Sequence, residues 1–392
     1  MRIVIVSEYY SRGMGHTENC LPKAIAALGH EVHVVSSNLN IYGNLPNYKE
    51  VFEKHLGISE QAVGSFQIDG YTVHRCKYRL VGGYIFIEGL IKKIEYLSPD
   101  VVQFTSAVSL NLCIIALFQK KFKWRIYSEC HQHMSVVRPF LKQKKGKYFQ
   151  KSLYYLTRTL PGHFMNTIVQ KCYAIAPDCA AIAHQMYGVP ENKIELLPLG
   201  TDTTLFQLNE NEEHRNIFRK ELGFLDNDIV CLYTGRFAHD KNPLLLARAV
   251  SLMQDEGLAF KGLFIGDGPQ KSSIENIKGI TVLPFVNYTD LPKFYQLADI
   301  GVWPTQESMS MLDASACGLP IIVSDRIGEI DRVDNNGLTY KEGDVYDLAC
   351  TMKKLIDRSY RKELGIRGRE KMVTKYSWHE NAKKRINEYT SH

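Results

Sequence analysis

The sequence lacks several motifs that mark common functional classes. Its nine cysteines are odd in number, scattered and never spaced as Cys-x-x-Cys, which argues against a disulfide framework or a zinc site and favours a reducing compartment. A Gly-x-x-x-x-Gly-Lys-Ser/Thr phosphate loop and a Gly-x-Ser-x-Gly nucleophile turn are also missing. These absences remove the P-loop and the α/β-hydrolase serine as sources of chemistry.

Long apolar runs are absent as well. The longest, "LCIIALF" at 112–118, is much shorter than the roughly 20 residues of a membrane-spanning helix. The N-terminal "MRIVIVSEYY" has too short an apolar stretch for a signal peptide and is strand-like in composition. We therefore expect a cytoplasmic protein that does not span a membrane.

The pattern that is present is an alternation of strands and helices. With 392 residues, of which 45% are hydrophobic and 23% charged, the chain is typical of a globular protein with two domains. Short apolar runs such as "RIVIVS" (2–7) alternate with segments of helical period, and the alternation restarts at "IVCLYTG" after a polar stretch at 201–228. The sequence therefore predicts an α/β protein with two Rossmann-like, doubly wound domains facing across a cleft. We expect them at 1–203 and 204–375, with a helix at about 376–392 packed back on the first.

Ligands of such sheets bind outside the carboxyl ends of the strands, so the residues after each strand are candidates. Gly13 and Gly15 follow the first strand, but Glu18 occupies the third glycine position of the dinucleotide fingerprint. His131 and His133 follow "RIYSE"; without a third metal ligand at a useful spacing, His131 is either a hydrogen-bond donor to a substrate or a structural histidine.

In the second domain, two cations follow a strand and precede a helix. Arg236 and Lys241 lie in "GRFAHDKNP", where the helix dipole and the two charges together would favour a diphosphate. The stretch "ESMSMLDASACGLP" (307–320) opens another helix after a strand. There Ser310 and Asp313 are spaced as a capping box, and the alternative is that this helix start binds an anion.

These residues together resemble glycosyltransferase family 4, which are retaining enzymes of the GT-B fold. The resemblance extends over nearly the whole chain in order and spacing. It is carried by "LPKAIAALGHEVHVVSS", "LPLGTDTTLF", "YTGRFAHDKNP", "IGDGP", "LPKFYQLADIGVWPTQES", "DASACGLPIIVSD" and "NNGLTYKEGDVYDLA".

The resemblance implies a role for each matching residue. Arg236 and Lys241, after the turn at Gly235, would hold the donor diphosphate, and Glu307 would contact sugar hydroxyls. The backbone amides of Met309, Ser310 and Met311 would bind phosphate, and Asp313 would bind the ribose hydroxyls. The backbone at Phe285 and Val286 would contact the nucleobase. His131 would lie near the transferred sugar, and Gly15 near the acceptor or the phosphate.

One feature departs from the family pattern. The family has two glutamates separated by seven residues, whereas here five residues separate Glu307 from Asp313. Asp313 is therefore either a ligand of the ribose diol or part of a helix cap. A carboxylate at a helix start can do both, and we favour ligand contact.

The resemblance implies a glycosyltransferase that moves a sugar from a UDP- or GDP-type nucleotide-diphospho-sugar to a hydroxyl of a glycan or lipid-linked acceptor, without a cofactor or metal. Bacterial surface polysaccharide synthesis is the expected setting. Two alternatives are a non-catalytic sugar-nucleotide-binding or membrane-associated scaffold and a nicotinamide oxidoreductase. The missing fingerprint glycine argues against the oxidoreductase.

The positive charge of the chain is concentrated in one segment. Residues 120–171 contain twelve Lys or Arg and one acid, Glu129, while the whole chain has a net charge of +6. Within 138–164, four lysines (Lys142, Lys144, Lys145, Lys147) precede Phe149, Leu153, Leu156 and Leu160 at helical spacing. One interpretation is peripheral contact with the inner face of an anionic membrane, and the other is an amphipathic core helix with a solvated basic loop. No nucleic-acid-binding motif accompanies the charge.

Overall fold

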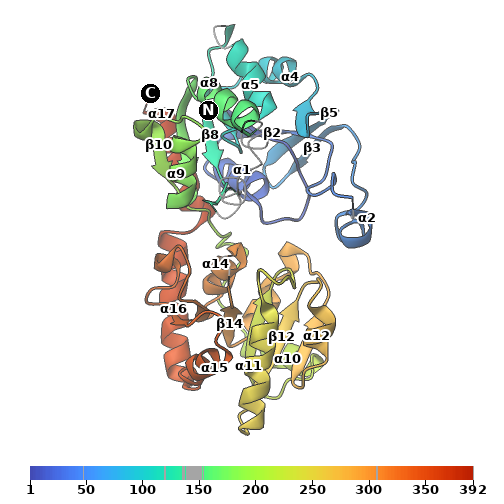
Figure 1. Ribbon diagram of the computed structural model, residues 1–392, viewed down its shortest axis with the longest axis vertical. Coiled ribbons are helices and arrows are strands. Elements are labelled where there is room, and N and C mark those ends of the chain that lie inside the picture. The colour runs from blue at the N-terminus through green and yellow to red at the C-terminus, as the bar shows by residue number, and fades with distance from the viewer. Residues whose placement is uncertain are drawn as a thin grey trace. The chain divides into compact units, whose positions relative to one another are not determined.

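The structure is a computed structural model that describes residues 1–46, 48–118, 121–134, 137, 152, 154–305 and 308–391. The chain divides into two compact units (Figure 1). Unit 1 comprises residues 1–199 and 381–392, and unit 2 comprises residues 200–380. Both are α/β units, as the alternation in the sequence predicts. The C-terminal residues return to unit 1, and unit 2 runs to Glu380 instead of ending near 375.

Unit 1 is built on a sheet of eight strands. The strand order is β10-β9-β8-β7-β1-β2-β4-β3, and all neighbours are parallel except β3 and β4. The strands are β1 (Arg2–Ser7), β2 (Glu31–Ser37), β3 (Gly64–Ile68), β4 (Tyr71–Cys76), β7 (Val101–Phe104), β8 (Arg125–Cys130), β9 (Val169–Ala174) and β10 (Ile194–Leu196), and β5 (Tyr78–Val81) with β6 (Tyr84–Ile87) forms a separate hairpin. The helices are α1 (Thr17–Ala27), α2 (Tyr48–Val51), α3 (Glu53–Leu56), α4 (Leu90–Leu97), α5 (Leu110–Leu117), a π-helical turn (Tyr155–Thr159), α8 (Leu160–Met165), α9 (Pro177–Gln185) and α17 (Trp378–Thr390), with a 3₁₀ turn at Glu191–Lys193.

Unit 2 has a sheet of six parallel strands in the order β13-β12-β11-β14-β15-β16. The strands are β11 (Ile229–Thr234), β12 (Phe260–Ile265), β13 (Ile280–Leu283), β14 (Ile300–Trp303), β15 (Ile321–Ser324) and β16 (Gly337–Tyr340). The helices are α10 (Glu212–Glu221), α11 (Pro243–Asp255), α12 (Lys271–Glu275), α13 (Pro292–Leu297), α14 (Met309–Ala316), α15 (Val345–Lys353) and α16 (Arg358–Thr374), with 3₁₀ turns at Tyr288–Asp290 and Ile330–Arg332.

The direction of strand addition reverses once in each sheet. In unit 1 the chain adds β2 on one side of β1 and later adds β7 on the other side; in unit 2 it adds β12 beside β11 and later β14 on the opposite side. At such a switch point the two connecting loops diverge and leave a crevice at the carboxyl ends of the central strands. The β1/β7 and β11/β14 positions are therefore the expected binding places.

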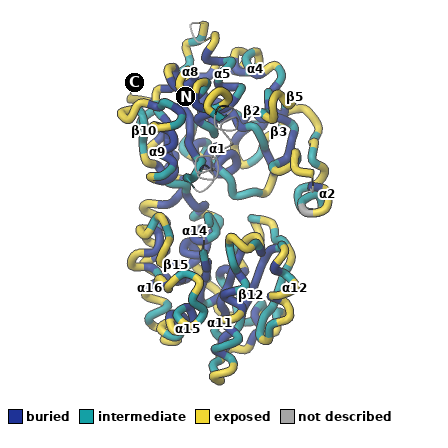
Figure 2. The backbone as a smooth tube through the Cα atoms, viewed as in Figure 1, coloured by how far each residue is buried: buried dark blue, intermediate teal, exposed yellow. Residues whose placement is uncertain are grey.

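The central strands form because continuous apolar runs are covered on both faces. Ile3, Val4, Ile5 and Val6 of β1 are at most 3% exposed, and the dark blue of Figure 2 marks the buried backbone inside each unit. Parallel strands buried between helices require this composition, since neither face meets water. The apolar runs therefore locate the central strands directly.

The polar stretch at 201–228 contains a helix that the sequence did not predict. In α10, Arg215 and Arg219 face inward and bind the carboxylate of Asp299 at 2.9 Å and 3.0 Å. Only two of the ten residues of α10, Ile217 and Phe218, are apolar, so the segment is polar overall in the sequence. The helix predicted at about 376–392 is present as α17, and α16 precedes it.

The last helix packs against the sheet of unit 1. Arg385 of α17 is fully buried and its Nη1 lies 2.7 Å from Glu129 Oε1 of β8, while the Tyr389 hydroxyl donates to Gln103 Oε1 at 2.8 Å. Figure 1 shows this red C-terminal helix beside β10 and α9. Among the described residues, no helix combines the length and the apolar character needed to cross a lipid bilayer.

Candidate functional site

In unit 2, the loops after β11 and β14 contact each other at the switch point. Ser310 Oγ, in the first turn of α14, donates to the carbonyl of Thr234, the last residue of β11, at 3.3 Å. The buried Trp303 joins the two by donating from Nε1 to Thr234 O at 3.2 Å and to Ser310 Oγ at 3.1 Å. Thr305 Oγ1 also donates to the carbonyl of Asp240 at 2.7 Å. The start of α14 and the loop that carries Arg236 and Lys241 therefore lie together.

Glycines allow the loops after β11 and β12 to approach closely. Gly235 has a φ of +146°, a region that residues with a Cβ rarely adopt, and so does Gly266. A Cβ on Gly266 would lie 2.0 Å from the carbonyl oxygen of Gly235, and one on Gly268 would lie 2.8 Å from that of Phe237. The "GDGP" turn therefore packs closely against the backbone of Gly235 and Phe237, on either side of Arg236.

The two predicted diphosphate ligands occupy the β11–α11 connection. The Arg236 side chain is 67% exposed and lies 3.6 Å from Asp240, an ion pair too exposed to fix its position strongly. The backbone of Lys241 donates to Ala238 O at 3.0 Å, two residues before α11 begins. Both cations are therefore at the carboxyl edge of the sheet, beside the start of α14.

The start of α14 differs from the predicted capping box. Ser308, with extended backbone (φ −142°, ψ 146°), is the N-cap, and Ser310 and Asp313 lie inside the helix. The capping interpretation of Ser310 and Asp313 is therefore wrong. The amide of Met311 donates to Ser308 O at 3.1 Å and is therefore already engaged. Of the three amides predicted to bind phosphate, those of Met309 and Ser310 remain as candidates. The first amides of a helix have no acceptor within it.

Asp313 is buried instead of lying at the helix start. It is 4% exposed and accepts a hydrogen bond of 2.6 Å from the Thr201 hydroxyl. Burial raises the pKa of Asp313 from 3.8 to about 7; the Thr201 hydrogen bond opposes this rise and the nearby charge of Asp202 adds to it. The ribose role of Asp313 stays a prediction, and the structure gives the side chain one partner already.

The remaining donor-site candidates are Phe285, Val286 and Glu307. Phe285 and Val286 follow β13 and are both partly buried, at the same edge of the sheet as Gly235. Their predicted contact with the nucleobase is neither supported nor opposed by these positions. Glu307 lies outside the described residues, although Thr305 and Ser308 on either side of it are part of the edge described above.

Unit 1 has a cavity of about 340 Å³ beside its own switch point. It is lined by residues 105–108 after β7, residues 129–132 at the end of β8, Arg158 and Tyr187. His131 is therefore at a cavity, whereas Gly15, in the loop after β1, is not part of its lining. Gly13, with φ +70°, provides the turn in that loop.

His131 is oriented by a buried charge pair. Its Nε2 lies 2.5 Å from Glu129 Oε2, and Glu129 is completely buried against Arg385. Burial alone would raise the pKa of Glu129, but the charge of Arg385 and the His131 hydrogen bond hold it below its usual value. Because Glu129 stays ionised, Nε2 of His131 carries a proton and Nδ1 is the nitrogen left for a substrate. A neutral His131 would thus accept a hydrogen bond instead of donating the predicted one.

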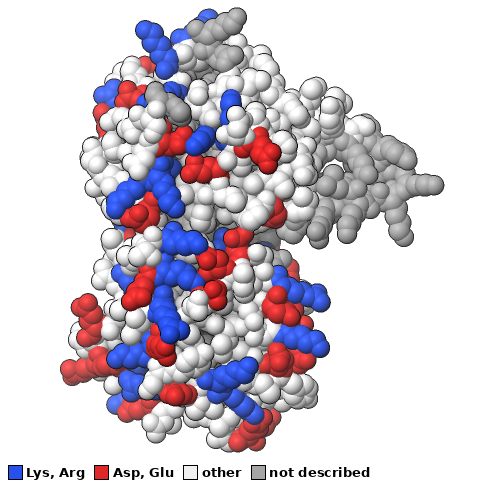
Figure 3. Space-filling view, turned by 90° about the vertical axis from the view of Figure 1, so that its left-hand side faces the viewer, with Lys and Arg blue, Asp and Glu red and all other residues white. Residues whose placement is uncertain are grey.

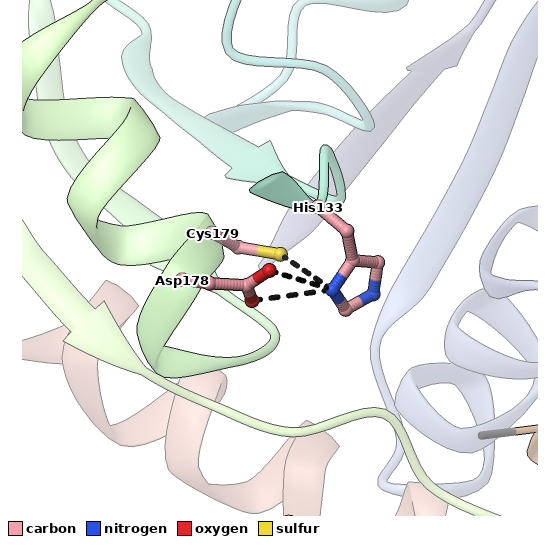
Figure 4. Close-up of side chains that lie close together, drawn as sticks. All are labelled: His133, Asp178 and Cys179. Carbon is pink, nitrogen blue, oxygen red and sulfur yellow. Dashed lines mark hydrogen bonds and ion pairs between the residues drawn. The ribbon is translucent and has the colours of Figure 1, made fainter. Parts of the chain in front are cut away.

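His133 belongs to a different cluster from His131. Its Nδ1 lies 3.2 Å from both carboxylate oxygens of Asp178 and 3.7 Å from Sγ of Cys179 (Figure 4). Asp178 also accepts from the amide of Met134 at 2.9 Å, so the cluster ties the segment after β8 to the first turn of α9. Nitrogen, oxygen and sulfur donors of this kind fit zinc, which the spacing in the sequence did not indicate. However, burial raises the pKa of Cys179, which favours the thiol over the thiolate that binds metals.

Several residues of unit 1 were not predicted from the sequence. Glu8 follows β1, and burial raises its pKa to about 7, opposed by the charge of Arg158. It could have been found by inspecting the first residue after each strand. Arg158 and Arg385 carry no such signal, because both are helical cations whose positions depend on tertiary packing.

Family models match both units of the chain. A glycosyltransferase family 4 model matches residues 20–205, and a model of group 1 glycosyl transferases matches residues 228–358. Among curated relatives, the alpha-monoglucosyldiacylglycerol synthase of Acholeplasma laidlawii is 24% identical over 82% of this chain and 80% of its own length. An uncharacterized glycosyltransferase of Methanocaldococcus jannaschii is 26% identical over 52% of this chain and 55% of its own length.

Solved glycosyltransferase structures share the fold over the full length of the chain. HepE from Anabaena, in complex with UDP, aligns with a TM-score of 0.71 and 14% identity over 100% of both chains. Sucrose-phosphate synthase from Thermosynechococcus elongatus aligns with a TM-score of 0.69 and 16% identity over 100% of this chain and 98% of that one. The similarity in structure shows a common GT-B fold, and the two family models supply the activity. The chain is therefore a glycosyltransferase of the family 4 type.

Proposed function

We propose that the protein transfers a sugar from a nucleotide-diphospho-sugar to a hydroxyl of a glycan or lipid-linked acceptor. The observation that carries this proposal is the edge of unit 2 at the β11/β14 switch point. Two cations, Arg236 and Lys241, and the start of α14 meet there through the hydrogen bond from Ser310 to Thr234. That HepE is solved in complex with UDP adds support for a UDP-sugar as the donor class.

The chemistry of this site is the departure of the nucleoside diphosphate. Negative charge develops on the leaving phosphate oxygens as the anomeric carbon becomes cation-like. Arg236, Lys241 and the amides of Met309 and Ser310 would stabilise that charge, and one such preorganised donor is typically worth about 3 kcal/mol. Four donors of this kind would make a metal ion and a cofactor unnecessary, so we propose transfer without either.

Retention of the anomeric configuration is part of the proposal. A double displacement would need a carboxylate nucleophile in unit 1. Glu129 lines the cavity there, but its two oxygens are bound to His131 and Arg385. A carboxylate held in this way is a poor nucleophile, which favours front-face attack by the acceptor hydroxyl assisted by the leaving phosphate.

The acceptor is proposed to be delivered from a membrane surface. Most of the basic segment 138–164 lies outside the described residues, but its last part is described and is apolar on the outside: Tyr155, Leu156, Leu160 and Phe164 are 55%, 58%, 52% and 41% exposed. A core helix would bury Leu156 and Leu160, so this exposure disfavours the alternative of an amphipathic core helix. Exposed apolar side chains next to a lysine cluster favour peripheral contact with an anionic membrane on its cytoplasmic side.

Named relatives are consistent with a bacterial surface role. One is a capsular polysaccharide biosynthesis glycosyltransferase of Staphylococcus aureus, 28% identical over 48% of this chain and 52% of its own length. On the face drawn in Figure 3, unit 2 carries side chains of both charge signs. In the sequence, residues 120–171 have the excess of Lys and Arg. Membership of the glycosyltransferase family leaves no support for the nicotinamide oxidoreductase, and a scaffold without activity becomes an outcome of the test.

The test combines donor binding with turnover. Purified protein is titrated with UDP-, GDP- and ADP-sugars by calorimetry, and hydrolysis of the tightest-binding donor is measured without an acceptor. Arg236→Ala and Lys241→Ala should each lower turnover by about 10²–10³-fold, as the loss of a transition-state donor does, with an unchanged fold. The control is Arg326→Ala, which removes a 77% exposed arginine of the same unit that no step of the proposal uses. Wild-type turnover in both site variants would refute the diphosphate assignment, and donor binding without any turnover would favour the scaffold.

A further inference from the structure

Arg158 lines the cavity of unit 1, and no carboxylate of the described residues forms an ion pair with it. Its guanidinium lies over the rings of Tyr84 and Tyr154, with centroid distances of 5.2 Å and 5.7 Å. Among the described residues, the structure shows neither an ion pair nor a hydrogen bond for this guanidinium. Two aromatic faces thus hold a cation in place while its N–H donors are left for another partner.

The other charges around the cavity do not neutralise Arg158. Glu129 lines the cavity, but Arg385 pairs with it at 2.7 Å and its second oxygen binds His131. Glu8 interacts electrostatically with Arg158 without forming an ion pair. Burial raises the pKa of Glu8 to about 7, so a large fraction of this carboxyl is neutral near neutral pH. The cavity therefore has an excess of positive charge at Arg158.

The local helix geometry accounts for the direction of Arg158. Residues 155–159 form a π-helical turn, which recurs at functional sites because it reorients side chains within a helix. Leu156 and Leu160 on this helix are exposed, whereas Arg158 lines the cavity. The same helix thus presents apolar side chains outward and a cation to the site.

We propose that Arg158 is the recognition residue for an anionic group, a phosphate or a carboxylate, on the acceptor substrate. The proposal deepens the function proposed above, since it names the chemical class of the acceptor. The cavity also presents His131, whose Nδ1 is left for a substrate hydroxyl, and the side chains of Thr105 and Ser106. An acceptor with a hydroxyl near His131 and an anion near Arg158 satisfies both ends.

The test compares matched neutral and charged probes. Binding of methyl glucoside, methyl glucuronide and methyl glucoside 6-phosphate to the full-length protein is measured by calorimetry in the presence of UDP. At least one charged probe should bind about 10- to 100-fold more tightly than the neutral one, the range of a charge-assisted hydrogen bond. Arg158→Gln should erase that preference, Arg158→Lys should retain part of it, and the control Arg79→Gln, at a 73% exposed arginine of unit 1, should leave it unchanged. A preference for phosphate or for glucuronate identifies which anion is used.

Two results would overturn the proposal. One is a wild type in which both charged probes bind no more tightly than methyl glucoside, and the other is an Arg158→Gln variant that keeps the preference and the melting temperature of the wild type. UDP affinity separates this proposal from the donor proposal. If Arg158→Gln weakens UDP binding, Arg158 belongs to the donor site and the inference is wrong. If wild-type protein binds no nucleotide at all, the donor proposal fails while the probe comparison without UDP still decides on Arg158.

Discussion

Replacing Asp313 by Asn tests the structural and the ligand roles of this side chain together. Asp313 is buried with Thr201 as its hydrogen-bond partner, and its pKa is raised from 3.8 to about 7. A carboxyl with a raised pKa binds its proton more tightly in the folded than in the unfolded state. Its contribution to stability is therefore largest at low pH and falls as the pH rises through the interval between the two values.

The size of this effect follows from the two pKa values. Proton linkage with values of 3.8 and about 7 gives a loss of about 2–3 kcal/mol in the unfolding free energy of the wild type between pH 5 and pH 8. Asn cannot ionise, so this loss should be absent from Asp313→Asn. The variant should therefore gain about 2–3 kcal/mol relative to the wild type over that range, whatever its stability at pH 5.

The assay is urea denaturation at pH 5, 6, 7 and 8, followed by tryptophan fluorescence, to which Trp303 of unit 2 contributes together with Trp124 and Trp378. Only the difference from the wild type is interpreted, because Glu8 titrates over the same range in both proteins. Asp331→Asn is the control, since Lys375 and Tyr376 lower the pKa of Asp331 and its titration ends below pH 5. A difference between Asp313→Asn and the wild type that is constant from pH 5 to pH 8 would refute the assignment of a buried, proton-binding carboxyl.

The same variant answers the question of ribose contact. If Asp313 accepts hydrogen bonds from the ribose hydroxyls, donor affinity should fall about 10- to 100-fold in Asp313→Asn, the cost of losing bonds to a charged acceptor. An unchanged donor dissociation constant would make Asp313 a residue that only holds α14 to Thr201.

Three further predictions concern unit 1. Arg385→Met should lower the stability of unit 1 by about 3–5 kcal/mol in urea denaturation, because it leaves Glu129 charged in the core without its arginine partner, and Arg385→Met with Glu129→Gln should recover most of that loss; a loss under 1 kcal/mol for the single variant would contradict the buried pair. The protein should co-sediment with anionic liposomes and less so as salt rises, and replacing Lys142, Lys144, Lys145 and Lys147 by Gln should abolish this, whereas the same change at the exposed Lys220, Lys278, Lys341 and Lys362 should not; indifference of the wild type to anionic liposomes at low salt would favour a soluble acceptor. Treatment with EDTA should leave turnover unchanged and the purified protein should contain far less than one zinc per chain, while stoichiometric zinc lost in Cys179→Ala would show that His133, Asp178 and Cys179 form a metal site.

The sequence predicted the elements whose composition is dictated by burial on both faces. Strands such as β1 and β11 are continuous apolar runs, and their carboxyl ends could be identified without a structure. α10 was missed because Ile217 and Phe218 are its only apolar residues and because the buried Arg219 binds Asp299 from within the fold. The local sequence also suggested a capping box at Ser310 and Asp313. In the structure Asp313 is inside the helix and binds Thr201, which is distant in the sequence.

The partners that set the chemistry of each site are distant in the sequence. Thr201 and Asp313 are 112 positions apart, and Glu129 and Arg385 are 256 apart. Spacing arguments detect groups that share one strand end or one helix turn, and they made Arg236, Lys241 and His131 candidates. They do not detect a partner from a distant part of the sequence. The contact of Asp313 with Thr201 and the contact of Glu129 with Arg385 were therefore not predicted.

The C-terminal helix therefore determines what His131 can do. Arg385 keeps Glu129 ionised, and the Nε2–H of His131 donates a hydrogen bond to Glu129. Nδ1 is therefore left as an acceptor in the neutral ring. An acceptor hydroxyl that donates to Nδ1 would be held with its oxygen lone pairs directed away from the ring, whereas a hydrogen bond from His131 to the transferred sugar requires the imidazolium. The two roles predict opposite changes of turnover on mild acidification: a fall would show acceptance from the hydroxyl by the neutral ring, and a rise would show donation to the sugar by the imidazolium.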